Sequence, residues 1–145
     1  MTKQSHVKQL LLGLHLFVLS SCTPLLANLA PPQEVITGTG QVEQVERKIK
    51  GFQTIELEDG INLSFEQDVN LTTPQLLIQA HENIIPFIST EVQGQTLVIK
   101  INNNQRLSSS STQSVKVKAS ALVNLKITNQ SRANLSNINQ NSVKE

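Results

Sequence analysis

The stretch from Lys50 to Ile101 decides the fold. It reads KGFQTIELEDGINLSFEQ (50–67), LLIQAHENIIPFI (76–88) and TEVQGQTLVIKI (90–101). Apolar and polar residues alternate in each run, and a period of two is typical of a half-buried β-strand. The residues expected to be buried are Ile55, Leu57, Ile61, Leu63, Phe65, Ile78, Leu97 and Ile99. Those expected to be exposed are Glu56, Glu58, Ser64 and Lys100.

Turn residues separate these strands. Gly60 follows Asp59 between the first two strand patterns, where we expect a positive φ that glycine adopts without strain. Gly94 marks a hairpin in the third run. Pro86 limits a short helical turn, which Asn83 is expected to cap through its side-chain oxygen.

The second half of the chain continues the alternation and then changes rhythm. Residues 115–119 alternate after a polar loop, 102–113. Short apolar pairs then flank an Asn-rich corner, 129–131; they are Leu125/Ile127 and Ala133/Leu135, followed by Ile138. Short strands divided by such corners suggest stacked coils of a β-solenoid, although two partial coils are too few to define a repeat.

The first residues have the features of a bacterial lipoprotein signal. Lys3 and Lys8 precede an apolar run, Leu10–Leu19, that is too short for a permanent membrane span. LSSC (19–22) looks like a lipobox, so we expect cleavage before Cys22, a diacylglyceryl thioether on its thiol, and a further acyl chain, such as palmitate, on its amine. The alternative is a secreted protein with an incidental cysteine.

The predicted organisation has three parts. Residues 1–21 are the signal peptide, 22–37 a flexible tether with three prolines, and 38–145 one β domain. Acyl chains on Cys22 would anchor the protein to a membrane of the cell envelope, facing either the periplasm or the surface.

Composition narrows the partners. The chain has 12 Lys and Arg against 11 Asp and Glu; removing residues 1–21 takes away Lys3 and Lys8 and leaves 10 against 11. Tyr and Trp are absent. Without a positive excess or stacking aromatic residues, nucleic acid is not an expected partner. A single cysteine cannot form a disulfide within one chain.

No group of residues resembles a catalytic or metal site. Beyond residue 21 the only histidine is His81. A catalytic nucleophile needs a base beside it, and a zinc ion needs three or four ligands, so one histidine does not define either site. The candidate carboxylates for acid–base catalysis are Glu56, Glu58, Asp59 and Glu66. Glu56 and Glu58 face the same way on one strand and are better explained as a solubilising pair that deters edge pairing. Asp59 and Asn62 offer oxygen atoms for calcium but lie in no calcium-loop motif. We therefore expect neither an enzyme nor a cofactor.

Four lysines fall on outward strand positions and would form at most a weak basic stripe. They are Lys100, Lys116, Lys118 and Lys126. The simpler interpretation is a set of solvated strand faces.

Several segments in order resemble the putative auto-transporter adhesin, head GIN domain family. They are GTG (38–40), GFQTI (51–55), GIN (60–62), AHENIIPFI (80–88), TEVQGQTLVI (90–99) and VKVKA (115–119). The resemblance implies right-handed β-helical, solenoid-like sheets behind a signal peptide or lipobox. The chain departs from the family at NQSR (129–132), where relatives have a Gly-Ser-Gly-like corner, and relatives continue for several coils. We therefore expect an incomplete solenoid at the C-terminal end.

The sequence leaves three functional hypotheses. The first is an envelope lipoprotein with a non-enzymatic, adhesin-like role that binds an envelope protein or polysaccharide. The second is a structural or stress-sensing module that acts by self-association. A carbohydrate-active enzyme is the third and least supported, because no cluster of acid and base residues is apparent.

Overall fold

The computed structural model describes residues 33–102, 105–108 and 110–139. The chain divides into two units, and every described residue belongs to the second, Pro32–Glu145. These residues form eleven strands in three sheets and one short 3-10 helix. The prediction of an all-β fold is confirmed.

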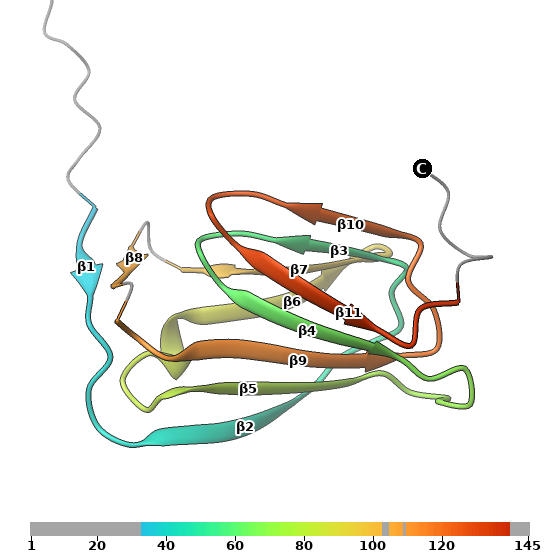
Figure 1. Ribbon diagram of the computed structural model, residues 1–145, viewed down its shortest axis with the longest axis horizontal. Helices are drawn as coiled ribbons and strands as arrows, with labels where there is room; N and C mark the ends of the chain where they lie inside the picture. Colours follow the sequence, from blue (N-terminus) through green and yellow to red (C-terminus); the bar gives the residue numbers. More distant parts are fainter. Residues whose placement is uncertain (1–32, 103–104, 109, 140–145) are drawn as a thin grey trace, which may run out of the picture. The chain divides into compact units, whose positions relative to one another are not determined.

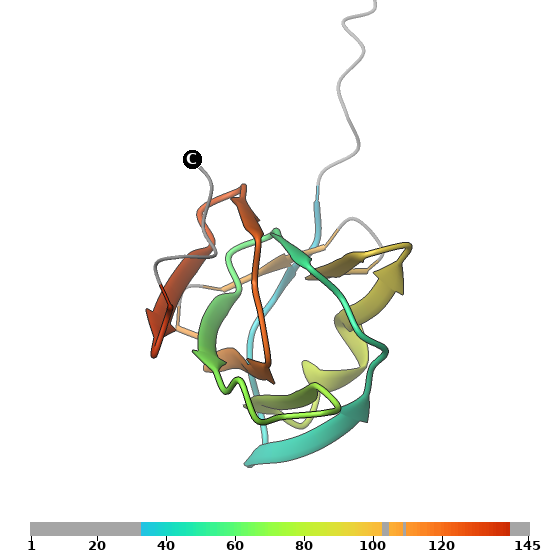
Figure 2. The same ribbon diagram turned by 90° about the vertical axis from the view of Figure 1, so that its right-hand side faces the viewer.

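Two larger sheets surround the core (Figures 1 and 2). The four-stranded sheet has the order β10 (Asn124–Ile127), β3 (Thr54–Leu57), β7 (Thr96–Ile101), β6 (Ile88–Gln93). The five-stranded sheet has the order β11 (Arg132–Ser136), β4 (Asn62–Gln67), β9 (Gln113–Ala119), β5 (Gln75–His81), β2 (Val42–Lys48). A third sheet pairs β1 (Val35–Ile36) with β8 (Arg106–Leu107), and the 3-10 helix η1 (Ile85–Phe87) precedes β6.

The alternating residues build the core as the sequence predicts. All eight residues that were expected to be buried are between 0% and 3% exposed. Of the four that were expected to be exposed, only Ser64 is; Glu56, Glu58 and Lys100 are half-buried. Glu56 is partly covered because β3 is an interior strand, with β10 on one side and β7 on the other.

Two pairs of consecutive strands cross from the four-stranded to the five-stranded sheet, and their parallel strands stack in register. β3 leads into β4, and β10 into β11. Asn124 pairs with Thr54 and Arg132 with Asn62, a constant offset of 70 residues. We call residues 124–136, which contain β10 and β11, the terminal coil. β7 and β9 form the layer on the other side of β3 and β4.

The remaining strands reverse direction. β5 and β6 pair antiparallel with β9 and β7, and β2 pairs antiparallel with β5 at the edge. The β6–β7 hairpin turns at Gly94, which has a φ of 61° as a tight turn requires. The fold therefore combines parallel layers with a reversed layer, and its classification as a right-handed β-helix stays a prediction.

Three local expectations are wrong. Val35 and Ile36, assigned to the tether, form β1, because residues 106–107 offer them a partner strand. Pro86 lies in the first turn of η1 instead of limiting an earlier one, a position where its missing N–H costs nothing. Asn83 does not cap this helix: its Oδ1 accepts a hydrogen bond from Thr39 N, and its Nδ2 donates to Thr37 O.

Candidate functional site

Two stacked corners lie where β3 and β10 end. Asp59 and Gly60 have φ values of 61° and 74°, and Asn129 and Gln130 have 51° and 64°. Asp, Asn and Gly tolerate this left-handed conformation best, so the positive φ expected at Gly60 is confirmed. The chain turns here from one sheet to the other instead of forming a hairpin. The Asn-rich corner repeats the Asp59-Gly60 geometry one layer away.

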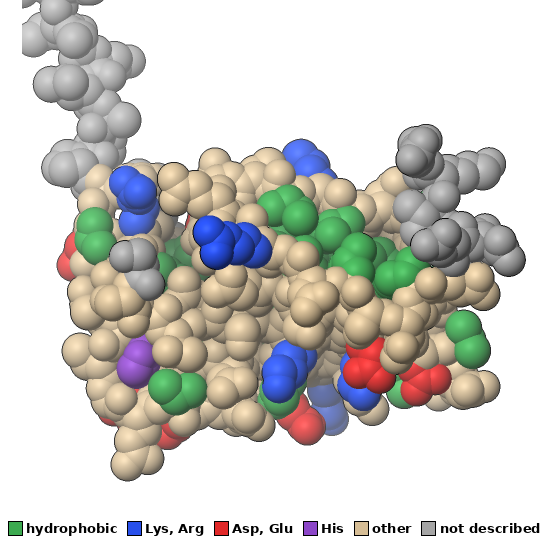
Figure 3. All heavy atoms as spheres, in the orientation of Figure 1, with side chains coloured by type: hydrophobic (Ala, Val, Ile, Leu, Met, Phe, Trp, Pro, Cys, Tyr) green, Lys and Arg blue, Asp and Glu red, His purple; other side chains and the backbone are tan. Residues whose placement is uncertain are grey.

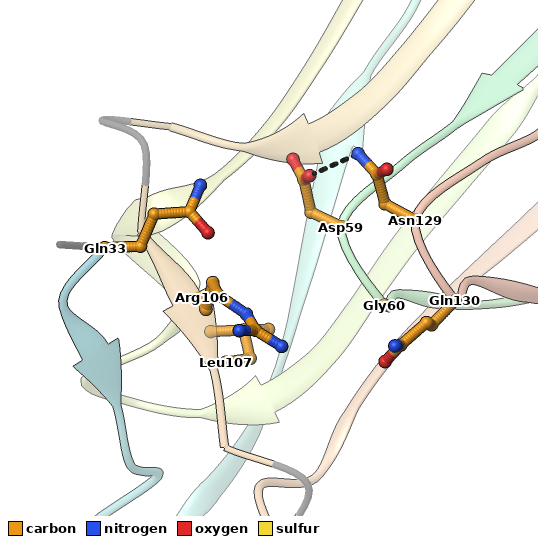
Figure 4. Close-up of a pocket in the computed structure, with 7 residues that line it drawn as sticks. All are labelled: Gln33, Asp59, Gly60, Arg106, Leu107, Asn129 and Gln130. Atoms are coloured by element: carbon orange, nitrogen blue, oxygen red, sulfur yellow. Dashed lines mark hydrogen bonds between the residues drawn. The ribbon is translucent and has the colours of Figure 1, made fainter. Parts of the chain in front are cut away.

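Asp59 joins the corners of three layers. Its Oδ2 accepts a hydrogen bond from Ile101 N at 3.1 Å, and its Oδ1 accepts one from Asn129 Nδ2 at 3.2 Å (Figure 4). Gly60 N donates to Ser131 Oγ at 3.0 Å. Each oxygen of the Asp59 carboxylate therefore accepts one hydrogen bond that holds the stack of layers together.

A polar cavity of about 310 Å³ adjoins the corners. Figure 4 shows Gln33 and Arg106 across this cavity from Asp59 and Asn129. Leu107 and the residues of both corners complete the lining. A neighbouring cavity of about 320 Å³ shares Gln33 and Asp59 with the first. Amide, carboxylate and guanidinium groups can donate and accept hydrogen bonds, so the lining suits a small polar ligand.

The sequence did not reveal these cavities. β1 and β8 bring Gln33 and Arg106 beside the corners, and these two-residue strands are too short to show alternation. The only available signal was the repetition of corner residues, Asp59-Gly60 and Asn129-Gln130, between paired strand patterns. That signal locates the corners but does not place the residues opposite them.

His81, the candidate catalytic histidine, packs against the backbone of the GTG segment (38–40). The ring of His81 lies where a Cβ on Gly38 would be, and its Nδ1 is 3.3 Å from Gly40 O. The GTG segment thus packs against His81, and Asn83 binds the same segment. The His81 ring therefore requires glycine at position 38, whereas Gly40 has a φ of 80° and lies against the Glu82 side chain.

The four candidate carboxylates do not share one site: Glu58 and Asp59 both line the second corner cavity, but Glu56 and Glu66 are held elsewhere. Glu56 on β3 pairs with Lys126, whereas Glu66 on β4, in the other sheet, pairs with Lys118 at 2.8 Å. The hydrogen bond and charge of each carboxylate raise the pKa of its lysine. Asn62 does not join Asp59 but donates to Gln113 O at 3.2 Å. Within the described ranges, no three His, Cys, Asp or Glu side chains group as metal ligands would.

The four outward lysines do not form one stripe. Lys100 and Lys126 belong to the four-stranded sheet, and Lys116 and Lys118 to the five-stranded sheet. Cys22, the predicted lipidation site, lies outside the described residues. No helix among the described residues combines the length and hydropathy needed to cross a membrane.

The fold and its corners define a class: an all-β domain in which parallel strands of two sheets stack at a fixed offset. The chain belongs to the putative auto-transporter adhesin, head GIN domain family, whose model matches residues 51–144. This match includes the GIN triplet at the first corner, residues 60–62. The resemblance drawn from the sequence is confirmed. No curated protein is significantly similar to the chain.

Solved bacterial structures share the fold. A putative lipid binding protein from Parabacteroides distasonis is 26% identical with a TM-score of 0.62, covering 71% of this chain and 44% of that one. A putative adhesin from Parabacteroides merdae is 22% identical (TM-score 0.58), covering 70% of this chain and 42% of that one. One from Bacteroides fragilis is 18% identical (TM-score 0.63), covering 70% and 46%. This chain thus spans less than half the length of each.

Proposed function

We propose that the protein is a cell-envelope lipoprotein with a non-enzymatic, adhesin-like binding role. Membership of an adhesin family and structural neighbours described as putative adhesins support this role. The 26% identical neighbour described as a putative lipid binding protein supports a ligand with apolar character. The lipobox before Cys22 supports an envelope location with a lipid anchor.

The binding role rests mainly on the apolar side chains and strand edges that the terminal coil exposes. Ile127 and Leu135 are 42% and 43% exposed, whereas their register partners Leu57 and Phe65 are fully buried. Figure 3 shows hydrophobic side chains gathered in a band over β10 and β11. Both strands also pair on one side only within the described sheets. Apolar surface beside an open strand edge is suited to a protein partner that adds a strand.

Self-association through the same surface is the second candidate function. Leu125 and Ala133 of the terminal coil pack against the core, and Ile127 and Leu135 lie in register with buried residues of the layer beneath but are themselves exposed. The terminal coil of a second copy would cover them and pair with the open strand edges. We propose that the parallel layers are the start of a right-handed β-helix that such an association extends.

Replacing Leu135 with Lys should abolish this association. We expect residues 22–145 carrying Cys22→Ser to show a mass by light scattering that rises with protein concentration. Leu135→Lys should remain monomeric, because it places a charge in the apolar band. Val69→Lys is the control, because Val69 is 65% exposed and lies in the loop between β4 and β5 rather than on a strand of the terminal coil.

A parent chain that stays monomeric at every concentration would rule out self-association. Binding of another protein would then be tested by cross-linking and pull-down from envelope extracts. A partner captured by the parent chain and by Val69→Lys, but not by Leu135→Lys, would support the binding role. Equal capture by all three would place the binding surface elsewhere.

Lipidation of Cys22 has a direct readout. Mass spectrometry of the N-terminal peptide from the membrane fraction should show a processed, acylated Cys22. Cys22→Ser should release the protein from that fraction or leave it uncleaved, because the acceptor thiol is gone. An unmodified N-terminus that begins after Ala27 or Ala30 would contradict lipid anchoring. It would not affect the binding role, which the light-scattering and pull-down experiments test separately.

A further inference from the structure

A second surface lies on the outer face of the five-stranded sheet, away from the terminal coil. The register of β2, β5 and β9 aligns outward side chains in two rows across these strands. The rows are Glu46–Leu77–Lys116 and Lys48–Gln75–Lys118. Leu77 thus sits in the middle of an otherwise polar face, and strand neighbours at this spacing are within side-chain contact.

These rows border a cleft of about 820 Å³. Three half-buried apolar residues contribute to its lining: Ile49 after β2, Pro74 before β5, and Leu77 on β5. This volume is within the range of pockets that bind drug-sized ligands. The lining of such pockets is mostly apolar, with a few polar groups that orient the ligand. The cleft has more than twice the volume of either corner cavity.

The cleft carries an excess of positive charge. Its lining includes Lys48, Lys116 and Lys118, whereas Glu46 is the acidic member of the lining. Lys118 is paired with Glu66, but in the described part of the chain Lys48 and Lys116 form no ion pair. Figure 3 shows basic side chains on this face over the lower strands, below the hydrophobic band. An anion bound here would therefore gain two unpaired ammonium partners.

We infer that this cleft binds a single-chain amphiphile with an anionic headgroup. The alkyl chain would lie on Leu77, Ile49 and Pro74, and the headgroup would meet Lys48 and Lys116. This site deepens the proposed binding role and rests on it, but it uses a surface separate from the terminal coil.

Titration calorimetry with dodecanoate below its micelle concentration tests the site. Residues 22–145 carrying Cys22→Ser should bind it saturably, and dodecyltrimethylammonium, with the same chain and a cationic headgroup, should not bind. Replacing both Lys48 and Lys116 with Gln should raise Kd about tenfold or more, as should Leu77→Gln. Dodecyl phosphate in a parallel titration tells a carboxylate preference from a phosphate preference, and saturable binding of either supports the site.

Matched controls lie on the other large sheet. Lys100→Gln with Lys126→Gln removes the same charge, and Val98→Gln replaces an outward apolar residue of β7. These variants should bind as the parent chain does, and thermal melts will show that all variants are folded. Absence of saturable binding, equal binding of the cationic amphiphile, or equal weakening by the controls would overturn the inference. Leu135→Lys should leave dodecanoate binding unchanged, so failure here is distinct from failure of the protein-binding surface.

Discussion

Replacing Phe65 with Ala should lower the free energy of unfolding by about 3–5 kcal/mol. Phe65 is fully buried on β4, where the register places it between Val117 of β9 and Leu135 of β11. The substitution removes the ring and leaves a cavity that neighbouring strands, fixed by their hydrogen bonds, can fill only in part. Domains are typically stable by about 5–15 kcal/mol, so this loss is a large share of the total. Denaturant melts will measure it.

Phe87→Ala is the control for Phe65→Ala. Phe87 ends η1 and is only half-buried, so its ring loses fewer contacts when it is truncated. We expect a clearly smaller loss of stability than at Phe65. A loss below about 1 kcal/mol for Phe65→Ala would show that the strand is not packed in this register.

The strand faces could be predicted because alternation reports burial directly. One residue of slippage would have moved Phe65 and Leu63 to the solvent side, and the structure buries both. The same reasoning fails where a strand has two residues, as in β1 and β8, or where neighbours on both sides cover an outward position, as at Glu56. Those outcomes depend on which strands pair with one another, and local alternation of apolar and polar residues does not specify the pairing.

The local sequence pattern also does not predict where the chain crosses from one sheet to the other. Asp59-Gly60 is as compatible with a hairpin as with a corner, because both need positive φ. Its use as a corner depends on the pairing of β4 with β9, in which each residue of β4 pairs with the residue 52 positions later. Neither the cavities at the corners nor the cleft beside Leu77 could therefore be assembled from the sequence, although their residues were visible in it.

Arg47 shows how the stack of strands is closed at the end opposite the terminal coil. It lies on the edge strand β2, and its register partner, Leu76, faces the core. Its Nη1 donates to Ile88 O at 2.6 Å and to Thr90 Oγ1 at 3.1 Å, and its Nη2 donates to Ile85 O at 3.2 Å. One guanidinium thus joins the five-stranded sheet to η1 and β6. In the sequence, Arg47 alternates in step with Val45 and Ile49, which indicates that its side chain lies on the same face of the strand as these two apolar residues.

Replacing Arg47 with Ala should lower the free energy of unfolding by about 2–3 kcal/mol, because charge-assisted hydrogen bonds contribute about 1.5–3 kcal/mol each and the relieved desolvation offsets part of the loss. Burial lowers the pKa of Arg47, but a guanidinium still remains charged at every accessible pH. Arg47→Lys should recover only part of the stability, because an ammonium cannot reproduce the planar fork.

Arg132→Ala, on the exposed face of β11, is the matched control and should change stability by less than about 0.5 kcal/mol. Denaturant melts of the three variants separate the explanations. If Arg47→Lys is as stable as the parent chain, charge alone matters and the fork geometry does not. If Arg47→Ala matches Arg132→Ala, the two sheets are held together at this end by their apolar contacts, and the guanidinium adds nothing to closure.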